Sequence, residues 1–491
     1  MSYASLPPTV GRDRRNILVD QQRSSHAEAV RIVVERLSDE VWELAELSLH
    51  EQSSSQAHLR ELESAGFTTS RGTTGIPTAF LAEWTQGEDG PVIGFLPEYD
   101  ALPGLGNAAV PRPEPLPQGL SSGHGCGHNL LGAALTGAAI AAKSAAEAHG
   151  LAARLRVYGC AAEETEGAKI YMAREGLFDD LDACLHWHPA PIAAVANVRL
   201  ASVNMLKLDF RGRTAHAGLE PWKGRSALDA LELAAHGLNL MREHVEPTAR
   251  IHYIVEAGGE APNIVPEHTR MFLVLRDIDR TRVNSMTDWV HEIADGAARA
   301  TQTSAELLVY AGMHDLLPNT PLAERMQSHL EQVGSPEWDD DEGEFARACQ
   351  RELGIPEAGL ADAVLPLPDE PSLGGATDVA EPSWITPTMG ITMPTMPLGV
   401  PLHTWPVTAC GGMSIGKKGA LAATEVLTRM ALDLLTDEEL RAAARSDFAR
   451  RRGDYAYTSP LPPDQLHPID LPDWLITDGS AEAMGALEQS S

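Results

Sequence analysis

Apolar residues in the first 200 positions of the chain alternate between the spacing of a helix and that of a strand. Between His26 and about Ala65 they recur with helical spacing, which predicts a segment that packs one face on a core. Short apolar runs predict buried strands. The further predicted elements are a strand over 91–96, a helix over 130–148, a strand over 154–159, a helix over 167–174 and a strand over 181–185. Residues 1–25 have the composition of a polar arm.

A different pattern begins near Ala201 and continues to Met313. Alternation of the kind seen in Leu206, Leu208 and Phe210 predicts strands, and two intervening segments have helical spacing. The resulting order, β-α-β-β-α-β, is that of a ferredoxin-like module. We therefore expect three parts. Residues 1–200 form the first part of a main body, 201–313 an inserted module, and 314–491 the second part of the main body.

Helical spacing returns in the last part of the chain, over 321–333, 419–435 and 437–452. An acidic stretch from Trp338 to about Pro371 predicts a loop-rich, solvated insertion. A Gly-rich turn over 374–378 and a loop over 394–403 follow it, and the chain ends in a Pro-rich tail.

Polar residues gather at the ends of the predicted strands of the main body. Acidic residues follow the strands over 91–96 and 154–159, and His186-Trp187-His188 follows the strand over 181–185. Ligands of open α/β sheets bind beyond the carboxyl ends of the strands. We therefore expect these polar clusters to meet in one crevice.

Composition limits the possible partners and the compartment. A length of 491 residues favours two domains, and a formal net charge of -31 argues against nucleic acid or an anionic membrane as a partner. The five cysteines are widely spaced, unlike a disulfide framework, which favours a reducing compartment. The first thirty residues hold no apolar run of a secretory signal, and the longest apolar stretch, 130–142, is too short to span a bilayer. A cytoplasmic location is the expectation.

Candidate metal ligands are concentrated in the stretch Gly123-His124-Gly125-Cys126-Gly127-His128-Asn129. Its glycines permit a tight backbone around the thiol and the imidazoles. Glu163 and Glu164 are adjacent carboxylates, which repel each other unless a cation or a shared proton lies between them. Thiolate, imidazole and carboxylate together suit zinc, cobalt, manganese or nickel rather than calcium. The candidate ligands of a pair of such cations are Cys126, His128, Glu164, His188 and His403.

Glu163 has a different predicted role. It lies beside a candidate ligand and is itself free, so it would be the general base that takes a proton from water and then protonates the leaving amine. A lone His or Cys is more often a structural residue than a ligand, but the clustering of these side chains favours the metal interpretation.

Several spaced motifs resemble those of the dinuclear metallopeptidases related to aminoacylase, carboxypeptidase G and the plant indole-acetyl-amino-acid hydrolases. The pattern most resembles that of the aminobenzoyl-glutamate hydrolase B subunits within this family. The motifs that carry the resemblance are Glu98-Tyr99-Asp100-Ala101-Leu102-Pro103, the 123–129 stretch, Glu163-Glu164, Thr214-Ala215-His216-Ala217 and Pro401-Leu402-His403.

The resemblance implies a fold and a set of roles. The fold would be a zinc-peptidase-like α/β/α sandwich whose inserted module is a dimerisation lid. Asp100 would orient a metal ligand from outside the coordination sphere. His216 and Asn263 would reach a neighbouring active site, where His216 stabilises the oxyanion. Arg276 would hold a substrate carboxylate.

At one position the chain departs from the pattern of one branch of the family, and at another the branches of the family differ in which histidine is the ligand. Asn129 stands where the plant branch has Asp, as in the subgroup with the most similar pattern. In the stretch His186-Trp187-His188, the Trp-His-Pro pattern of that subgroup makes His188 the metal ligand, and His186 is the alternative. Outside the resemblance, His216 and Asn263 are also explained as turn-forming residues.

These observations predict hydrolysis of the amide bond of an N-acyl or N-aminoacyl amino acid, with an aminobenzoyl-glutamate-like or dipeptide-like substrate. Two divalent cations and a homodimer are expected, with a paralogous partner subunit as an alternative. One rival is a hydrolytic deaminase that uses the same site. A second rival is a non-catalytic subunit, which the complete set of candidate residues disfavours.

Overall fold

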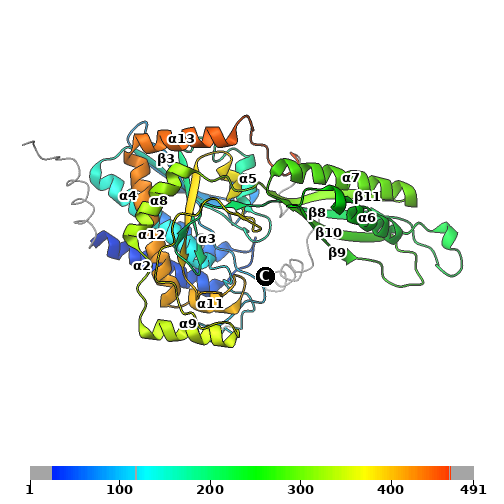
Figure 1. The fold of residues 1–491 in the computed structure, drawn as a ribbon, viewed down its shortest axis with the longest axis horizontal. Coiled ribbons are helices and arrows are strands. Elements are labelled where there is room, and N and C mark those ends of the chain that lie inside the picture. The colour runs from blue at the N-terminus through cyan, green and yellow to red at the C-terminus, as the bar shows by residue number, and fades with distance from the viewer. Residues whose placement is uncertain (1–24, 117–118, 464, 466–491) are drawn as a thin grey trace, which may run out of the picture.

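The structure, a computed structural model, describes residues 25–116, 119–463 and 465. It consists of a main body built on a seven-stranded sheet and an elongated module that projects from one side (Figure 1). Apart from Ser25, the predicted polar arm lies outside the described residues, as does residue 466 onward of the Pro-rich tail.

The seven-stranded sheet of the main body is mixed. Its strands, in spatial order, are β1 (Thr68–Arg71), β2 (Phe80–Gln86), β4 (Ala153–Gly159), β3 (Val92–Phe95), β5 (Ala183–Ala190), β13 (Thr388–Pro394) and β6 (Ala194–Val195). The central strands β4, β3, β5 and β13 are parallel to one another. Their carboxyl ends therefore lie at one edge of the sheet, where the predicted polar clusters begin.

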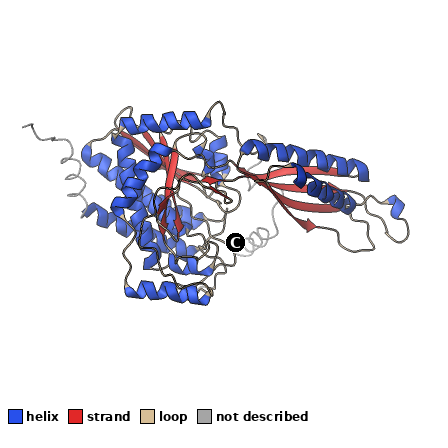
Figure 2. Cartoon of the chain, in the orientation of Figure 1, coloured by secondary structure: helices blue, strands red, loops and turns tan. Residues whose placement is uncertain are grey.

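Helices flank this sheet (Figure 2). The helix α4 (His128–His149) is Ala-rich and buried along most of its length, so that α2 (Ser25–Leu44) and α12 (Ser414–Thr436) can pack closely against it. α4 connects β3 to β4, and α5 (Ala168–Arg174) connects β4 back to β5. Right-handed connections that run in opposite directions across a sheet place their helices on opposite faces. The main body is thus an α/β/α arrangement.

The inserted module contains a four-stranded antiparallel sheet with two helices. Its elements are β8 (Ser202–Arg211), α6 (Ala227–Met241), β9 (Arg250–Ala257), β10 (His268–Asp277), α7 (Arg280–Thr301) and β11 (Ser304–Met313), and the spatial strand order is β11-β8-β10-β9. Ser226 caps α6 and Asp279 caps α7 through side-chain hydrogen bonds. The predicted β-α-β-β-α-β order is confirmed.

The remaining elements surround the main sheet. They are α3 (Gln52–Ser64), β7 (Arg199–Leu200), α8 (Thr320–Val333), α9 (Asp340–Glu352), β12 (Ser372–Leu373), α10 (Ala380–Ser383), α11 (Trp405–Gly411), α13 (Glu438–Arg452) and the short 3-10 turns η1 (Thr73–Gly75), η2 (Pro221–Lys223) and η3 (Arg242–His244). No helix within the described ranges is long and apolar enough to cross a membrane. All five cysteines are buried and free.

Three predictions about local structure were incomplete. The helical segment over 26–65 is two helices, because Ala45 and Leu49 adopt left-handed backbone conformations between α2 and α3. The strands β1, β2 and β13 were missed. β13 contains glycine and proline, which weaken the signal of a buried strand. The stretch His186-Trp187-His188 lies within β5 and does not follow it.

The acidic stretch after Trp338 is more ordered than predicted. Asp339 caps α9 in a capping box with Glu342, so acidic residues there occupy the first turn of a helix, where the helix dipole favours them. Glu342 also pairs with Lys418 of α12 at 2.6 Å. This part of the insertion is therefore a docked helix.

Candidate metal centre and catalytic site

The stretch that carries Cys126 and His128 is a tight turn directly before α4. Gly127 adopts a φ of 82°, and a Cβ at Gly125 would come within 2.3 Å of the side chain of Leu105. Glycine is required at both positions for these reasons. The turn places both candidate ligands at the carboxyl edge of the sheet, and both are buried.

Asp100 fixes the orientation of the His128 ring. His128 Nδ1 lies 2.8 Å from Asp100 Oδ1, and Asp100 Oδ2 accepts hydrogen bonds from Ser48 Oγ at 2.9 Å and from the backbone N–H of Glu164 at 3.0 Å. His128 Nε2 consequently faces the acidic side chains. It is 3.3 Å from Glu98 Oε2 and 4.0 Å from Glu163 Oε2.

Cys126 is common to two groups of potential metal ligands. In one group it lies with His128 and His188, and in the other with Glu164 and His403. The ligand atoms of each group are within 4.8 Å of one another. Cys126 Sγ is 3.4 Å from His188 Nε2. The structure thus brings together all five side chains that we predicted as ligands, and it divides them into two sets that share the thiol.

His188 and His186 lie in different surroundings, although the alternation of β5 places both on one face of the strand. Trp187, between them, points to the other face and donates to Leu131 O of α4 at 3.0 Å. His188 Nδ1 lies 2.7 Å from Pro189 O, which leaves Nε2 directed at Cys126. His186 packs closely against Gly390 of β13 and belongs to none of the ligand groups.

The two adjacent glutamates follow β4 in a strained loop. Ala162 has a φ of 54°, and its N–H donates to the buried carboxylate of Glu51 at 2.7 Å. Glu164 Oε1 is 3.2 Å from His403 Nε2. Glu163 Oε1 instead accepts a hydrogen bond from Thr377 Oγ1 at 3.0 Å. The two carboxylates therefore have different partners.

These environments move the pKa values of the two carboxyls apart. Burial, followed by the nearby charge of Glu98, raises the pKa of Glu163 to about 8. Burial also acts to raise the pKa of Glu164, but the hydrogen bond from His403 and the charge of His128 lower it overall. Such a separation between neighbouring groups is typical of sites that assign them different proton-transfer roles.

Burial favours the uncharged forms of the His188 imidazole and the Cys126 thiol. Burial and the nearby His128 lower the pKa of His188 to about 4, so its imidazole is neutral. Burial raises the pKa of the Cys126 thiol. A divalent cation reverses this last effect, because coordination favours the thiolate.

His403 is the most exposed of the five candidate ligands. Its side chain is 51% accessible, and its φ is 60°. The backbone N–H of His403 donates to Gly125 O at 2.8 Å, which ties this loop to the turn that carries Cys126. The side of the site nearest His403 is consequently open to solvent, where substrate can enter.

The residues expected to act from the inserted module lie outside this cluster. His216 and Asn263 are exposed in two loops that are joined by a hydrogen bond from Ala217 N to Asn263 O at 3.0 Å. β8 runs outward from the main body, so the loop after it lies at the far end of the module (Figure 1). Arg276 lies near the opposite end, with Nη1 3.1 Å from Gly374 O. Within one chain, His216 and Asn263 do not join the cluster.

Four residues around Glu163 had no part in the predicted site. Lys169 of α5 is fully buried, donates to Glu98 Oε1 at 2.7 Å and also pairs with Asp378. Thr377 donates to Glu163. A lysine inside the helical pattern of 167–174 gives no sign of burial. Glu98, however, is part of the quoted Glu98-Tyr99-Asp100 motif, and its position two residues from Asp100 could have identified it.

His124 and Asn129, the other polar residues of the 123–129 stretch, have structural contacts. His124 Nε2 lies 2.9 Å from Val41 O. Asn129 Nδ2 donates to Ser38 Oγ at 3.1 Å and to Gly411 O at 3.2 Å. Asn129 therefore joins α4 to α2 and α11, away from the ligand groups.

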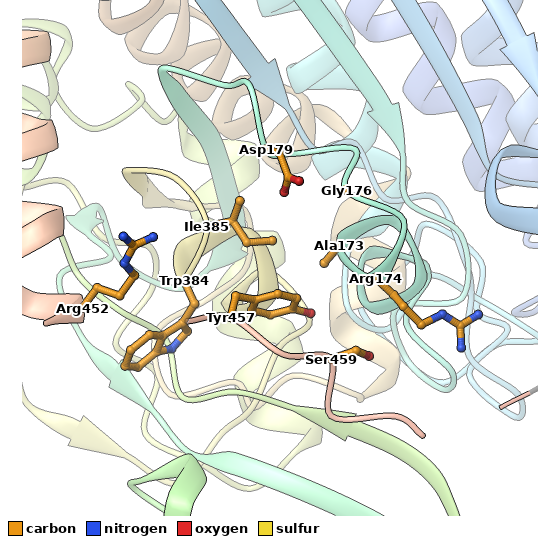
Figure 3. Close-up of a pocket in the computed structure, with 9 residues that line it drawn as sticks. All are labelled: Ala173, Arg174, Gly176, Asp179, Trp384, Ile385, Arg452, Tyr457 and Ser459. Carbon is orange, nitrogen blue, oxygen red and sulfur yellow. The ribbon is translucent and has the colours of Figure 1, made fainter. Parts of the chain in front are cut away.

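A hollow of about 430 Å³ elsewhere on the main body is lined by different chemistry. Figure 3 shows Tyr457 near its centre, with Trp384 and Arg452 on one side and Arg174 on the other. None of its lining residues belongs to the predicted site. It offers no metal-ligand group comparable to the one around Cys126.

The donor set at Cys126 fits a pair of divalent cations. It combines thiolate, imidazole and carboxylate donors, as borderline-soft transition metals prefer. His128 Nε2 and Glu98 Oε2 are buried and have no hydrogen-bond partner among the described residues. Buried polar atoms are costly when unpaired, and a cation bound here would satisfy the imidazole nitrogen.

Comparison with known proteins identifies the inserted module. Residues 201–301 match the family model described as a peptidase dimerisation domain. The chain is 36% identical over 454 residues to the B subunit of p-aminobenzoyl-glutamate hydrolase from Escherichia coli, covering 87% of this chain and 94% of that protein. It is 30% identical over 386 residues to the Xaa-Arg dipeptidase of Mus musculus, covering 76% of this chain and 78% of that protein.

A solved structure has the same fold. The Bacillus subtilis YxeP protein, a dinuclear metal-binding peptidase of the M20 family, matches with a TM-score of 0.54 and 17% identity, covering 84% of this chain and 99% of that one. The two-domain architecture and the paired ligand groups around Cys126 are consistent with the similarity that extends along most of the chain. The chain belongs to the M20 family of dinuclear metal peptidases and amidohydrolases, which act on carbon–nitrogen bonds.

Proposed function

We propose that this enzyme hydrolyses the amide bond between an acyl or aminoacyl group and an amino acid. The observation that carries the proposal is the position of Glu163 outside both ligand groups built on Cys126, with its Oε2 4.0 Å from His128 Nε2. Glu163, Glu98 and His128 form a third group of potential ligands, so the carboxylate lies at the edge of the metal centre. A spare carboxylate next to metal ligands is what amide hydrolysis needs for proton transfer. The names of the E. coli and mouse relatives both describe substrates in which the amine side of the scissile bond is an amino acid.

Cys126, His128, Glu164, His188 and His403 would hold two divalent cations, with zinc, manganese, cobalt and nickel as the candidates. When bound, such cations lower the pKa of a water molecule and polarise the carbonyl group of the substrate. Asp100 keeps the His128 ring in the orientation that points Nε2 into the site.

Glu163 is the proposed general base and then the general acid. Its carboxylate accepts a proton from the attacking water and later donates it to the leaving amine. The raised pKa belongs to the metal-free site. Bound cations would lower it, so that the carboxylate is ionised when it accepts the proton and can then return the proton to the amine.

The inserted module would complete the site across a homodimer. His216 and Asn263 lie at the outer end of the module, where they would reach the active site of a second copy of the chain. His216 would stabilise the oxyanion there. Arg276 remains the candidate for binding a substrate carboxylate. The boundaries at 200 and 313 and a cytoplasmic location also stay predictions.

The test is the variant Glu163→Gln, measured with a panel of N-acyl amino acids and dipeptides and with each of the four metals. We expect unchanged metal content and a loss of turnover of about 100- to 10,000-fold, the usual contribution of a positioned base. Glu88→Gln, which changes an exposed turn residue, is the control. Near-normal turnover of Glu163→Gln would show that the base is another residue.

The same assay separates the proposal from its rivals. Release of a free amino acid indicates amide hydrolysis, whereas release of ammonia indicates deamination. Activity of the purified chain alone excludes the role of a non-catalytic subunit that depends on a paralogue.

A further inference from the structure

The hydroxyl of Thr377 is oriented toward Glu163 by its own hydrogen bonds. The backbone N–H of Val379 donates to Thr377 Oγ1 at 3.3 Å, and Thr377 Oγ1 donates to Glu163 Oε1 at 3.0 Å. A hydroxyl has one proton to donate and two lone pairs to accept with. The bond from Val379 uses one lone pair and leaves the hydroxyl proton free, and Thr377 donates this proton to the Glu163 carboxylate.

The residue next to Thr377 is held by a buried ion-pair network. Asp378 accepts the backbone N–H of Lys169 at 3.2 Å and also pairs with Lys169 Nζ. Lys169 Nζ donates to Glu98 Oε1 at 2.7 Å, and all three side chains are buried. Removing one partner of such a network leaves an uncompensated charge, so its geometry is strongly fixed. Thr377 therefore has little freedom to move away from Glu163.

The other end of the same loop is joined to the inserted module. Gly374 O accepts from Arg276 Nη1 at 3.1 Å, and Gly375 O accepts from Ala201 N at 2.8 Å. Ala201 lies directly before β8, and Arg276 lies in the last part of β10, so both belong to the end of the module nearest the main body. The loop 374–378 thus connects this junction to Glu163.

We propose that Thr377 is a positioning residue for Glu163, held in place by the Lys169–Asp378 ion pair. Glutamate has several rotatable bonds, and fixing its carboxylate at one position costs conformational entropy. The hydroxyl of Thr377 selects the rotamer in which Glu163 faces His128 and the ligand groups. This inference rests on the proposed role of Glu163 as the base, and it adds a residue that acts through that base.

The test compares two substitutions of one side chain. Thr377→Val keeps the branched shape and removes the donor, whereas Thr377→Ser keeps the donor and removes a methyl group. For Thr377→Val we expect kcat to fall about 10-fold, as for the loss of one hydrogen bond to a charged group, with KM and metal content unchanged. Thr377→Ser should recover most of the lost kcat. Thr85→Val, on the exposed side of β2, is the control for the chemical change.

A second measurement does not depend on activity. In crystals of the metal-free Thr377→Val protein, we expect the Glu163 carboxylate to leave its position near His128 Nε2, while Thr377→Ser preserves it. An unmoved carboxylate in Thr377→Val, or a kcat that is equal in the Val and Ser variants, would overturn the proposal.

The activity of Glu163→Gln distinguishes a failure of the positioning role of Thr377 from a failure of the proposed role of Glu163 as the base. If Glu163→Gln is inactive and Thr377→Val is fully active, only the positioning role is wrong. If Glu163→Gln is active, the proposed base is wrong, and the crystallographic comparison still reports whether Thr377 holds the carboxylate.

Discussion

Asp100 accepts a hydrogen bond from His128 Nδ1 at 2.8 Å, and both side chains are completely buried. The second oxygen of Asp100 accepts the N–H of Glu164. One carboxylate therefore orients a candidate ligand from the turn before α4 and the backbone of a second candidate ligand from the loop after β4. The two halves of the predicted metal centre are connected through a residue that is not itself in any ligand group.

The variant Asp100→Asn should weaken metal binding. The amide keeps the size of the carboxylate, but one of its two polar atoms becomes a donor and must face another donor, either on His128 or on Glu164. We expect about 10- to 100-fold lower affinity for metal, the usual effect of losing a residue that supports a ligand. Calorimetric titration of the metal-free protein measures it, with the exposed Asp362→Asn as the control. Equal affinities would show that the orientation of His128 does not depend on Asp100.

The two histidines of β5 can be separated by metal stoichiometry. His188 Nε2 faces Cys126, whereas His186 packs against Gly390. We expect His188→Gln to lower the bound metal from two ions per chain to about one, since one of the two ligand groups loses an imidazole. His186→Gln should retain both ions. Elemental analysis of the dialysed proteins decides the matter, and the opposite pattern would make His186 the ligand.

The spacing of apolar residues was sufficient to predict elements with a regular pattern of apolar positions along the sequence. α4 buries small residues along most of its length, and apolar residues alternate with polar ones along β8 from Leu206 to Phe210, so their spacing in the sequence is clear. β13 was missed because its glycine and proline have little intrinsic strand preference. It is a strand because it pairs with β5, whose sequence lies about two hundred positions earlier.

The candidate ligands were recognised by type and clustering, whereas their surroundings depend on contacts that the chain order does not reveal. Thr377 and Glu163 are 214 positions apart, and Lys169 and Asp378 are 209 positions apart. Neither contact leaves a periodic pattern. Ala162 and His403 both adopt left-handed backbone conformations, in the loop of the two glutamates and on the open side of the site. The sequence does not indicate these conformations, because neither residue is glycine.

Complementation between subunits tests the predicted role of His216. His216→Ala and Glu163→Gln should each inactivate a homodimer. If His216 acts in the partner's site, the heterodimer of these two variants has one site with both residues intact. We expect about half of the wild-type activity from such a heterodimer, purified with two different tags, because one of its two symmetric sites is restored. An inactive heterodimer would place His216 in the site of its own chain, and an active His216→Ala homodimer would place it outside catalysis.

His58 predicts a pH dependence of stability that is independent of the metal centre. It is buried with Nδ1 2.8 Å from Thr136 Oγ1, and burial lowers its pKa to about 3. In the unfolded chain the pKa of histidine is about 6.5. Below that pH the unfolded state binds the additional proton and the folded state does not, so stability present above pH 6.5 is lost progressively as the pH falls toward 3.

The variant His58→Gln should remove this contribution. Between pH 7 and pH 5 the wild-type protein should lose about 2 kcal/mol more of its unfolding free energy than the variant, the cost that follows from a pKa of 6.5 in the unfolded chain. Urea unfolding of the metal-free proteins at both pH values measures the difference. His291→Gln, on the exposed side of α7, controls for the loss of a histidine and should follow the wild type. If the pH dependence of His58→Gln equals that of the wild type, His58 is protonated in the folded state at pH 5, and its burial does not exclude the charge.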